Sequence, residues 1–389
     1  MNDLLQRLTN HLSENISAPT ESLYAVMASE SEPLQNAAYD VLQRIIPPEQ
    51  EEISLEKALD NSFEAKLPEE LLSLILAPPI LDYTLEERLK MAIPVSLRSY
   101  LLSWKLTLLH WEKASNAVQQ DYAKSLSDGH YTSDLLDFIV DLLITSRHKP
   151  FEPSGVSIGN YELDPGQRPD KDLGYYLAHL FYLILLRLPS PSKIWWRESA
   201  SRQKTIAVES WTEKHISPHI ISLELTAVKD WASSQDTAAD TPLNVKVSQN
   251  AKEITASIPI DERTTSISIR LPQSYPLARA EVTGLQRVGV AENKWQSWIR
   301  NAQGQLTVSD GGSNALIDCL LAWRRNVTAA MKGQTECAIC YSVVGADKTL
   351  PKKECPTCKN RFHAGCLFRW FKSSNSSSCP LCRNTFAYS

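Results

Sequence analysis

The strongest constraint on this fold is a run of cysteine and histidine residues near its C-terminal end. Seven of the eight cysteines lie between Cys337 and Cys382, and the first 318 residues contain none. The spacing is C-x2-C-x14-C-x2-C-x4-H-x2-C-x12-C-x2-C, which arranges the candidate ligands in four pairs. These ligands are Cys337, Cys340, Cys355, Cys358, His363, Cys366, Cys379 and Cys382. Paired thiols beside a histidine bind zinc at four-coordinate sites, so we expect two Zn²⁺ ions.

The distribution of thiols also indicates the compartment in which the protein works. A secreted disulfide scaffold spreads its cysteine pairs over the whole fold, and Met1 is not followed by the basic and apolar regions of a signal peptide. The most apolar stretch, 173–188, contains His179 and Arg187 and is shorter than the span of about 20 residues that a bilayer requires. We therefore expect a cytosolic (cytoplasmic) protein with no membrane partner.

The net charge leaves little scope for general binding to nucleic acid. The chain has 40 Lys and Arg residues and 45 Asp and Glu residues, so any RNA contact needs a local basic patch. From residue 337 onward, eight basic residues face only Asp347 and Glu354. Seven thiolates on two Zn²⁺ ions leave a charge of about −3. We therefore interpret the basic residues, including Lys352 and Lys353, mainly as counter-charges.

The first 200 residues show the 3.6-residue period of amphipathic helices. One stripe consists of Leu173, Tyr176, Leu177, Leu180, Phe181 and Ile184, and another of Leu135, Phe138, Ile139, Leu142 and Leu143. Prolines at 47–48, 78–79, 94, 150 and 189 are expected to separate successive helices. The pattern favours a scaffold of helical hairpins similar to HEAT repeats, with an irregular helical domain as the alternative.

Between 201 and 332 the period changes to that of half-buried strands. Alternating apolar and polar residues predict strands at 221–227, 254–260 and 267–271, and another strand is expected at 281–285. Turns are expected at 250–252, 261–263 and 272–276. Two helices follow, the second with a candidate N-cap at Ser313. Its apolar face consists of Leu316, Cys319, Leu320, Trp323 and Val327.

This order of a four-stranded meander, a Tyr275-Pro276 turn and C-terminal helices resembles the RWD domain. RWD domains are α+β domains that share the fold of ubiquitin-conjugating enzymes, which use a cysteine nucleophile after the meander. The one cysteine in this region, Cys319, falls on the apolar face of a helix, where a buried and unreactive thiol is expected. The resemblance therefore implies a domain that binds and does not catalyse.

The order of the zinc ligands is shared by PHD fingers, which read histone tails, and by RING variants. A PHD finger has tryptophan two positions before the seventh ligand, where this chain has Ser377. RING domains that recruit conjugating enzymes have an apolar residue before the second ligand, a tryptophan four residues after the sixth, and a proline inside the last pair. Ile339, Trp370 and Pro380 occupy these positions, and Arg383 matches the arginine that bonds both the conjugating enzyme and ubiquitin. The tail resembles a RING, which implies these roles for the four residues.

The RING resemblance also implies a cross-brace, in which the first ligand pair shares a metal with the third and the second with the fourth. One site would hold Cys337, Cys340, His363 and Cys366, and the other Cys355, Cys358, Cys379 and Cys382. The gaps of two and four residues around Cys358 exceed the usual one and two, so the central loop is expected to differ in shape. Ile339 and Leu381 could instead fill a small core, which leaves a structural zinc adaptor as an alternative to the PHD-type reader.

Three stretches of the tail resemble the listerin family of RING-type ubiquitin ligases in ribosome-associated quality control. They are Cys-Ala-Ile-Cys-Tyr-Ser-Val-Val, Lys-Asn-Arg-Phe-His-Ala-Gly-Cys-Leu and Trp-Phe-Lys-Ser-Ser-Asn-Ser. The resemblance implies recruitment of a ubiquitin-charged conjugating enzyme and ubiquitylation of incomplete nascent chains on stalled large ribosomal subunits, beside a nascent-chain-binding NEMF-type factor. Members of that family are longer than this chain, which we expect to match their C-terminal part.

We therefore expect a multidomain chain with three regions. Residues 1–200 form an all-α helical repeat region, residues 201–332 an α+β RWD domain, and residues 333–389 a small zinc-stabilised cross-brace RING. The linker before the RING, at about 332–336, is short.

Overall fold

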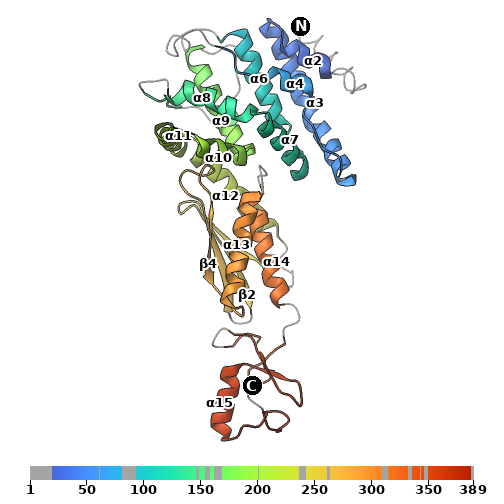
Figure 1. Cartoon of the computed structure of the whole chain (residues 1–389), viewed down its shortest axis with the longest axis vertical. Coiled ribbons are helices and arrows are strands. Elements are labelled where there is room, and N and C mark those ends of the chain that lie inside the picture. Colours follow the sequence, from blue (N-terminus) through green and yellow to red (C-terminus); the bar gives the residue numbers. More distant parts are fainter. Residues whose placement is uncertain are drawn as a thin grey trace. The chain divides into compact units, whose positions relative to one another are not determined.

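The computed structural model describes residues 20–60, 62–80, 93–145, 149–153, 158–161, 169–199, 201–235, 242–260, 263–308, 314–331, 335–341, 343–345 and 349–386. They separate into two compact units (Figure 1). The first comprises the described residues up to Ile220 together with Gln273–Ala278, and the second comprises the described remainder. Within these ranges, no helix is long and apolar enough to cross a membrane.

The first unit is built almost entirely of helices. They are α2 (Thr20–Met27), α3 (Glu32–Leu59), α4 (Glu69–Leu74), α6 (Val95–Leu109), α7 (Asn116–Asp128), α8 (Tyr131–Val140), α9 (Pro169–Arg187), α10 (Pro189–Glu198) and α11 (Arg202–His215). A short π-helical segment, Asp141–Thr145, extends α8, and a 3-10 turn, Ile158–Asn160, precedes α9. The predicted all-α region is confirmed.

Its core forms where helices α6, α8, α9 and α11 meet. All six residues of the predicted α9 stripe are buried, because α9 passes through the middle of the unit and is covered on several sides. Trp104 of α6 is fully buried, and the Trp211 ring of α11 packs edge-on against Phe181 of α9 with ring centroids 5.7 Å apart. This packing gives the helical region a continuous apolar core.

The prediction that prolines 47–48 end a helix was wrong. Both lie inside α3, which continues to Leu59. A proline inside a helix removes a backbone hydrogen bond and costs about 3 kcal/mol. Tertiary contacts offset this cost, since Ile46 and Gln50 on either side are buried and the Gln50 side chain accepts a hydrogen bond of 2.8 Å from Tyr122 of α7. The other prolines lie beyond α4, between helices, or at the starts of α6 and α10.

The prediction of a strand at 221–227 was also wrong. These residues belong to helix α12 (Ser217–Ser234). Ile221, Leu225 and Val228 are buried at the spacing of one helical face, whereas Leu223 is exposed. The short alternation of residue types imitated a strand. The first strand is instead β1 (Asn244–Ser248), whose only apolar residues are two half-buried valines, too few for a clear period.

The sheet of the second unit is an antiparallel meander in the order β1-β2-β3-β4. Strands β2 (Glu253–Ile260), β3 (Arg263–Arg270) and β4 (Glu281–Gln286) confirm the predicted ones. The first hairpin turn is confirmed by the hydrogen bond from the Lys252 N–H to the Gln249 carbonyl, while the connection at 261–262 lies outside the described residues. The 272–276 turn is present, with a cis peptide before Pro276.

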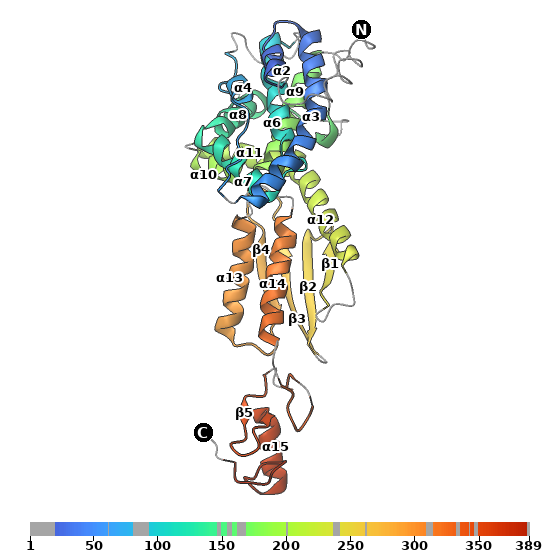
Figure 2. The ribbon, with the colours of Figure 1, turned by 90° about the vertical axis from the view of Figure 1, so that its right-hand side faces the viewer.

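Two helices lie against this sheet, α13 (Glu292–Val308) and α14 (Ala315–Met331), as Figure 2 shows. The predicted apolar face of α14 is confirmed, since all five of its residues are buried. The candidate N-cap, Ser313, lies outside the described residues. Beyond α14 come the short strands β5 (Lys353–Glu354) and β6 (Arg361–Phe362) and helix α15 (Ala364–Ser374). The predicted order of a helical region, an α+β domain and a zinc-ligand region is confirmed, while the boundaries near 200 and 332 remain predictions.

Candidate metal centre

Three Cys-x-x-Cys pairs form turns of the same shape. In each, the residue after the second cysteine has a positive φ and its N–H donates to the carbonyl of the first cysteine. The three bonds run from Tyr341 to Cys337 (2.8 Å), from Lys359 to Cys355 (3.0 Å) and from Arg383 to Cys379 (3.0 Å), at φ values of 56°, 59° and 63°. Each turn therefore presents two sulfur atoms to the same side of the backbone.

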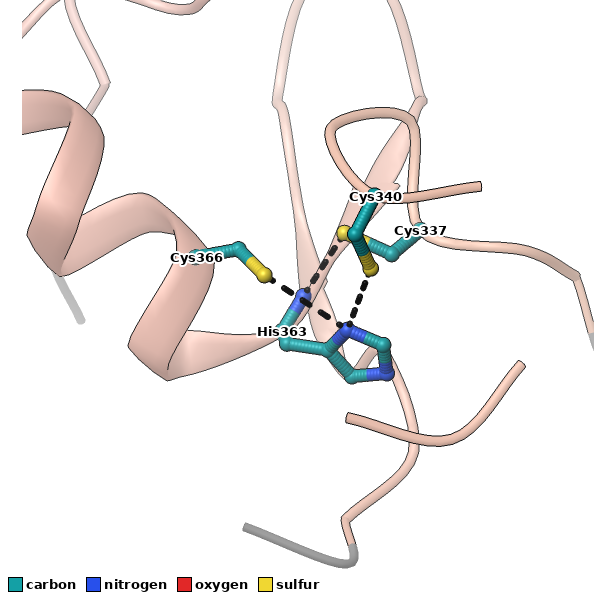
Figure 3. A group of neighbouring side chains, drawn as sticks. All are labelled: Cys337, Cys340, His363 and Cys366. Atoms are coloured by element: carbon teal, nitrogen blue, oxygen red, sulfur yellow. Dashed lines mark hydrogen bonds between the residues drawn. The ribbon is translucent and has the colours of Figure 1, made fainter. Parts of the chain in front are cut away.

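The first ligand group combines the first turn with the start of α15 (Figure 3). The ligand atoms of Cys337, Cys340, His363 and Cys366 all lie within 4.8 Å of one another. The His363 Nδ1 atom is 3.4 Å from the Cys340 sulfur and 3.8 Å from the Cys366 sulfur. On the other side of the ring, Nε2 lies 3.3 Å from the Val343 carbonyl. An Nε2–H donor to Val343 leaves the lone pair of Nδ1 for a metal ion.

The second group combines the other two turns. The Cys355 and Cys382 sulfurs are 3.7 Å apart, as are the sulfurs of Cys358 and Cys379. Ligands at about 2.3 Å from a tetrahedral zinc ion would have sulfurs about 3.8 Å apart, and a zinc-bound nitrogen and sulfur would be about 3.6 Å apart. Both groups match these values. The structure thus confirms the two predicted sets of four, and the donors present fit two Zn²⁺ ions.

The pKa values of the thiols show why such a cluster favours a cation. Burial, followed by repulsion from the charge of Cys337, raises the pKa of Cys366 to about 12. Hydrogen bonding from the side chain and backbone of Asn360 lowers the pKa of Cys358 to about 6. The Cys358 thiolate of the second group is therefore readily formed, while ionisation of Cys366 in the first group is resisted. A bound dication relieves this repulsion and stabilises every thiolate.

The unusual central spacing has a structural explanation. The second turn, Cys355 to Cys358, lies at the tip of the β5–β6 hairpin, and its base is closed by a bond of 2.9 Å from the Cys355 N–H to the Asn360 carbonyl. The Ala338 N–H donates to the Arg361 carbonyl at 3.1 Å, which ties the first turn to β6. The longer gaps provide a full turn and a short hairpin. The sequence predicted a different loop shape here but not these two strands.

Helix α15 connects the two ligand groups. It begins directly after His363 and carries Cys366 of the first group. One turn later, the Trp370 indole N–H donates to the Ser378 carbonyl at 3.1 Å, beside Cys379 of the second group. Under the helix, Phe362 and Leu367 are buried against Phe386, whose ring centroid is 6.0 Å from that of Phe362. Phe386 was not predicted as a core residue, because it follows the last ligand and belongs to no periodic pattern.

The proposed conjugating-enzyme residues lie beside these ligands. Ile339, Trp370 and Pro380 are all half-buried, and Ile339 packs against the cysteine core. Leu381, weighed as a core filler, is 50% exposed and does not fill the core. Tyr341, which the sequence analysis did not single out, is 75% exposed directly after Cys340. Exposed apolar side chains therefore lie on the first and last turns and also on α15, where Phe368 is exposed.

Two further predicted positions differ strongly in exposure. Arg383 is exposed, and its positive φ and backbone bond to Cys379 define where its side chain leaves the last turn. Cys319 is fully buried on the inner face of α14, and burial raises its pKa to about 12. A buried thiol with a raised pKa has almost no thiolate at neutral pH, so it cannot act as a nucleophile.

Three models of known families match this chain, one for each of the three predicted regions. A model described as the LTN1 family HEAT repeat region matches residues 13–229. A ubiquitin conjugating domain-like model matches 243–330, and a Ring finger domain model matches 335–383. These matches agree with the HEAT-like, RWD-like and RING interpretations of the sequence.

Several curated relatives carry the description "E3 ubiquitin-protein ligase listerin". The protein from Neurospora crassa is 42% identical over 376 residues, which is 94% of this chain and 23% of the relative. The Schizosaccharomyces pombe protein is 33% identical over 91% of this chain and 22% of its own length. The mouse protein is 28% identical over 97% of this chain and 22% of its own length. The chain thus spans less than a quarter of these relatives.

Proposed function

This chain belongs to the LTN1 family, and from that premise we propose that it is the part of a listerin-type ubiquitin ligase that recruits a ubiquitin-charged conjugating enzyme. The observation that carries the proposal is the interleaving of two four-ligand groups within a segment that matches a Ring finger domain. Two zinc ions held there would fix the relative positions of the first turn, the last turn and α15. The ions supply structure, and the surrounding side chains bind the partner.

The conjugating-enzyme face consists of Ile339 on the first turn, Trp370 on α15 and Pro380 on the last turn. Its support lies in their positions: Ile339 directly precedes the ligand Cys340, Pro380 directly follows the ligand Cys379, and Trp370 bonds to the loop between the groups. Leu381 and Tyr341 add exposed apolar area on the same two turns. An aromatic anchor with an apolar surround is typical of a binding hot spot.

Catalysis would proceed without a covalent bond between this chain and ubiquitin. All seven cysteines of the tail belong to the ligand groups, and Cys319 is buried. The thioester of the charged conjugating enzyme would be attacked by a substrate lysine while the chain holds ubiquitin in the reactive orientation. Arg383 would stabilise that arrangement, because its guanidinium can bond to carbonyls of two partners at once.

We further propose the substrate and the location of the reaction. The relatives are described as listerin, and the resemblance in the tail implies ribosome-associated quality control. The substrate would be an incomplete nascent chain on a stalled large ribosomal subunit in the cytosol, with an NEMF-type factor bound nearby. The RWD-like domain would bind and not catalyse, since it has no accessible cysteine among its described residues. A short linker to the RING would then restrict where ubiquitin is delivered.

A single-turnover discharge assay tests this function. A conjugating enzyme charged with ubiquitin is mixed with free lysine and the zinc-loaded chain, and the loss of thioester is followed with time. We expect discharge to accelerate in proportion to the chain added, up to saturation. No acceleration with any of a panel of conjugating enzymes, with two zinc ions still bound, would support the structural zinc adaptor.

A further inference from the structure

The orientation of the Trp370 indole depends on one hydrogen bond. Its Nε1–H donates to the Ser378 carbonyl at 3.1 Å, and the side chain is half-buried. Ser378 belongs to the loop that connects α15 to the ligand Cys379. The position of one loop carbonyl therefore determines how the indole is presented to a partner.

The hydroxyl of Ser376 restrains the residue that carries this carbonyl, through its N–H and its hydroxyl. The Ser376 Oγ atom accepts the Ser378 N–H at 3.3 Å and is 2.9 Å from the Ser378 hydroxyl, so it closes a turn over two residues. The loop is also tied to the end of the helix, because the hydroxyl of Ser374, the last residue of α15, donates to the Ser376 carbonyl at 3.4 Å. The far side of Ser378 is held by its bridge to Thr385. Ser376 itself is exposed and contacts no zinc ligand through its hydroxyl.

We infer that Ser376 is a positioning residue for conjugating-enzyme recruitment, acting through Ser378 on the indole of Trp370. The inference rests on the proposed function, in which Trp370 contacts the conjugating enzyme. Without the Ser376 hydroxyl, Ser378 keeps its bridge to Thr385 and the Cys379 N–H bond to the Asn384 carbonyl but loses its restraint on the helix side, so the indole gains alternative orientations. Binding must then select one of them, which weakens affinity without changing any contact residue.

The same loop offers a matched control. Ser377 is the next residue, is also exposed, and has no side-chain hydrogen bond within the described structure. Its carbonyl accepts the Phe386 N–H at 2.8 Å, and an alanine there would keep that bond. Ser377→Ala therefore removes a hydroxyl from the loop without opening the turn. Ser376→Asn restores an acceptor for the N–H two residues later, as asparagine does in turns.

The experiment measures the Kd of the full, zinc-loaded chain for an uncharged conjugating enzyme chosen by its activity in the discharge assay. We expect Ser376→Ala to raise Kd about threefold to tenfold, the usual effect of one hydrogen bond. Ser377→Ala and Ser376→Asn should stay within about twofold of the unmodified chain. At saturating conjugating enzyme, Ser376→Ala should discharge at the unmodified rate, because only recruitment is affected. In a Trp370→Ala background, Ser376→Ala should add nothing.

The outcomes separate the inference from the function on which it rests. If Trp370→Ala weakens binding and Ser376→Ala does not, the positioning role is wrong and the proposed function stands. If neither variant changes Kd, the proposed face itself is wrong. An equal effect of Ser376→Ala with and without Trp370, or loss of a zinc ion from the Ser376→Ala chain, would mean that Ser376 acts elsewhere, and would also overturn the inference.

Discussion

The Nδ1 atom of His363 lies 3.4 Å from the sulfur of Cys340, although 23 positions separate the two residues in the chain. His363 follows a hairpin and Cys340 closes a turn, and the small core around them consists largely of cysteine ligands together with Phe362, Leu367 and Phe386. A metal ion at this point closes the fold of the tail. Each ligand group brings distant residues together in this way, so the folding of the tail should depend on both metal ions.

Metal analysis of the purified chain should find two zinc ions. A strong chelator should unfold residues 337–386 while the helical first unit stays folded, because about 10 kcal/mol or more of folding free energy comes from each structural zinc. Hydrogen exchange after chelation measures this directly. Cys319→Ser is the control and should keep both ions and full discharge activity, since Cys319 belongs to neither group. A stoichiometry of one would show that the two-site assignment is wrong.

Trp370→Ala should weaken binding of the conjugating enzyme by about 2 kcal/mol, or roughly 30-fold, the usual loss for a buried aromatic anchor. The side chain is half-buried, so the variant should retain its fold and both zinc ions. Calorimetric titration with uncharged conjugating enzyme provides the measurement. Unchanged affinity with zinc retained would favour the structural adaptor over the ligase.

Arg383→Ala should separate recruitment from transfer. Arg383 is proposed to bond the conjugating enzyme and ubiquitin together, and this pair exists only when ubiquitin is attached. The affinity of the Arg383→Ala chain for uncharged conjugating enzyme should therefore change by less than about twofold. Single-turnover discharge at saturating conjugating enzyme should slow by about tenfold or more, as expected for loss of an orienting charged hydrogen bond. Arg383→Lys should restore little of the discharge rate, because the lysine ammonium lacks the forked donor geometry of the guanidinium. Equal discharge rates for Arg383→Ala and the unmodified chain would exclude the role.

Acidification should destabilise the first unit through His110. Burial lowers the pKa of His110 to about 4, and its Nδ1 atom lies 2.9 Å from the Leu106 carbonyl, consistent with a neutral donor ring. In the unfolded chain the pKa returns to about 6.5, so the unfolded state binds the proton first as pH falls. Stability attributable to this group is therefore lost between pH 6.5 and 4, by about 1 kcal/mol from pH 7 to pH 5.5.

Urea unfolding at the two pH values checks this expectation. His110→Gln should reduce the loss of unfolding free energy between pH 7 and pH 5.5 by about 1 kcal/mol relative to the unmodified chain. His219→Gln, at an exposed position, should leave it unchanged. Zinc binding contributes equally in all three proteins, so it cancels from the comparison. A loss as large in His110→Gln as in the unmodified chain would contradict the assignment.

The chain should bind isolated large ribosomal subunits with an affinity that falls as salt rises, because rRNA phosphates would contribute to the contact. Removing residues 243–330 should abolish ubiquitylation of nascent chains on stalled subunits and spare discharge to free lysine. The deletion begins after α12 because Val208 and Trp211 of α11 belong to the core of the first unit. Substrate modification that survives this deletion would mean that the RWD-like domain is only a spacer.

Some elements could not be predicted from local pattern. Pro47 and Pro48 follow the rule for a helix end, yet α3 continues through them because Ile46 and Gln50 are buried against other helices. Apolar and polar residues alternate over the seven residues 221–227, as in a strand. The segment is nevertheless helical, because Leu225 and Val228 are buried on one face of α12. In both places a local preference was overruled by tertiary contacts, which no window of a single sequence contains.

The ligand residues are the opposite case. Metal coordination restricts both residue type and spacing, so Cys337 to Cys382 could be identified, and even paired through a family resemblance, without coordinates. Only the tertiary structure decided how the side chains between the ligands are used: that Leu381 faces solvent and that Ser376 bonds to Ser378, whose carbonyl receives the Trp370 indole N–H. Such roles depend on backbone turns and on hydrogen bonds between neighbouring loops. A sequence records the composition of a loop, whereas its hydrogen bonds arise only when the chain is folded around the metal.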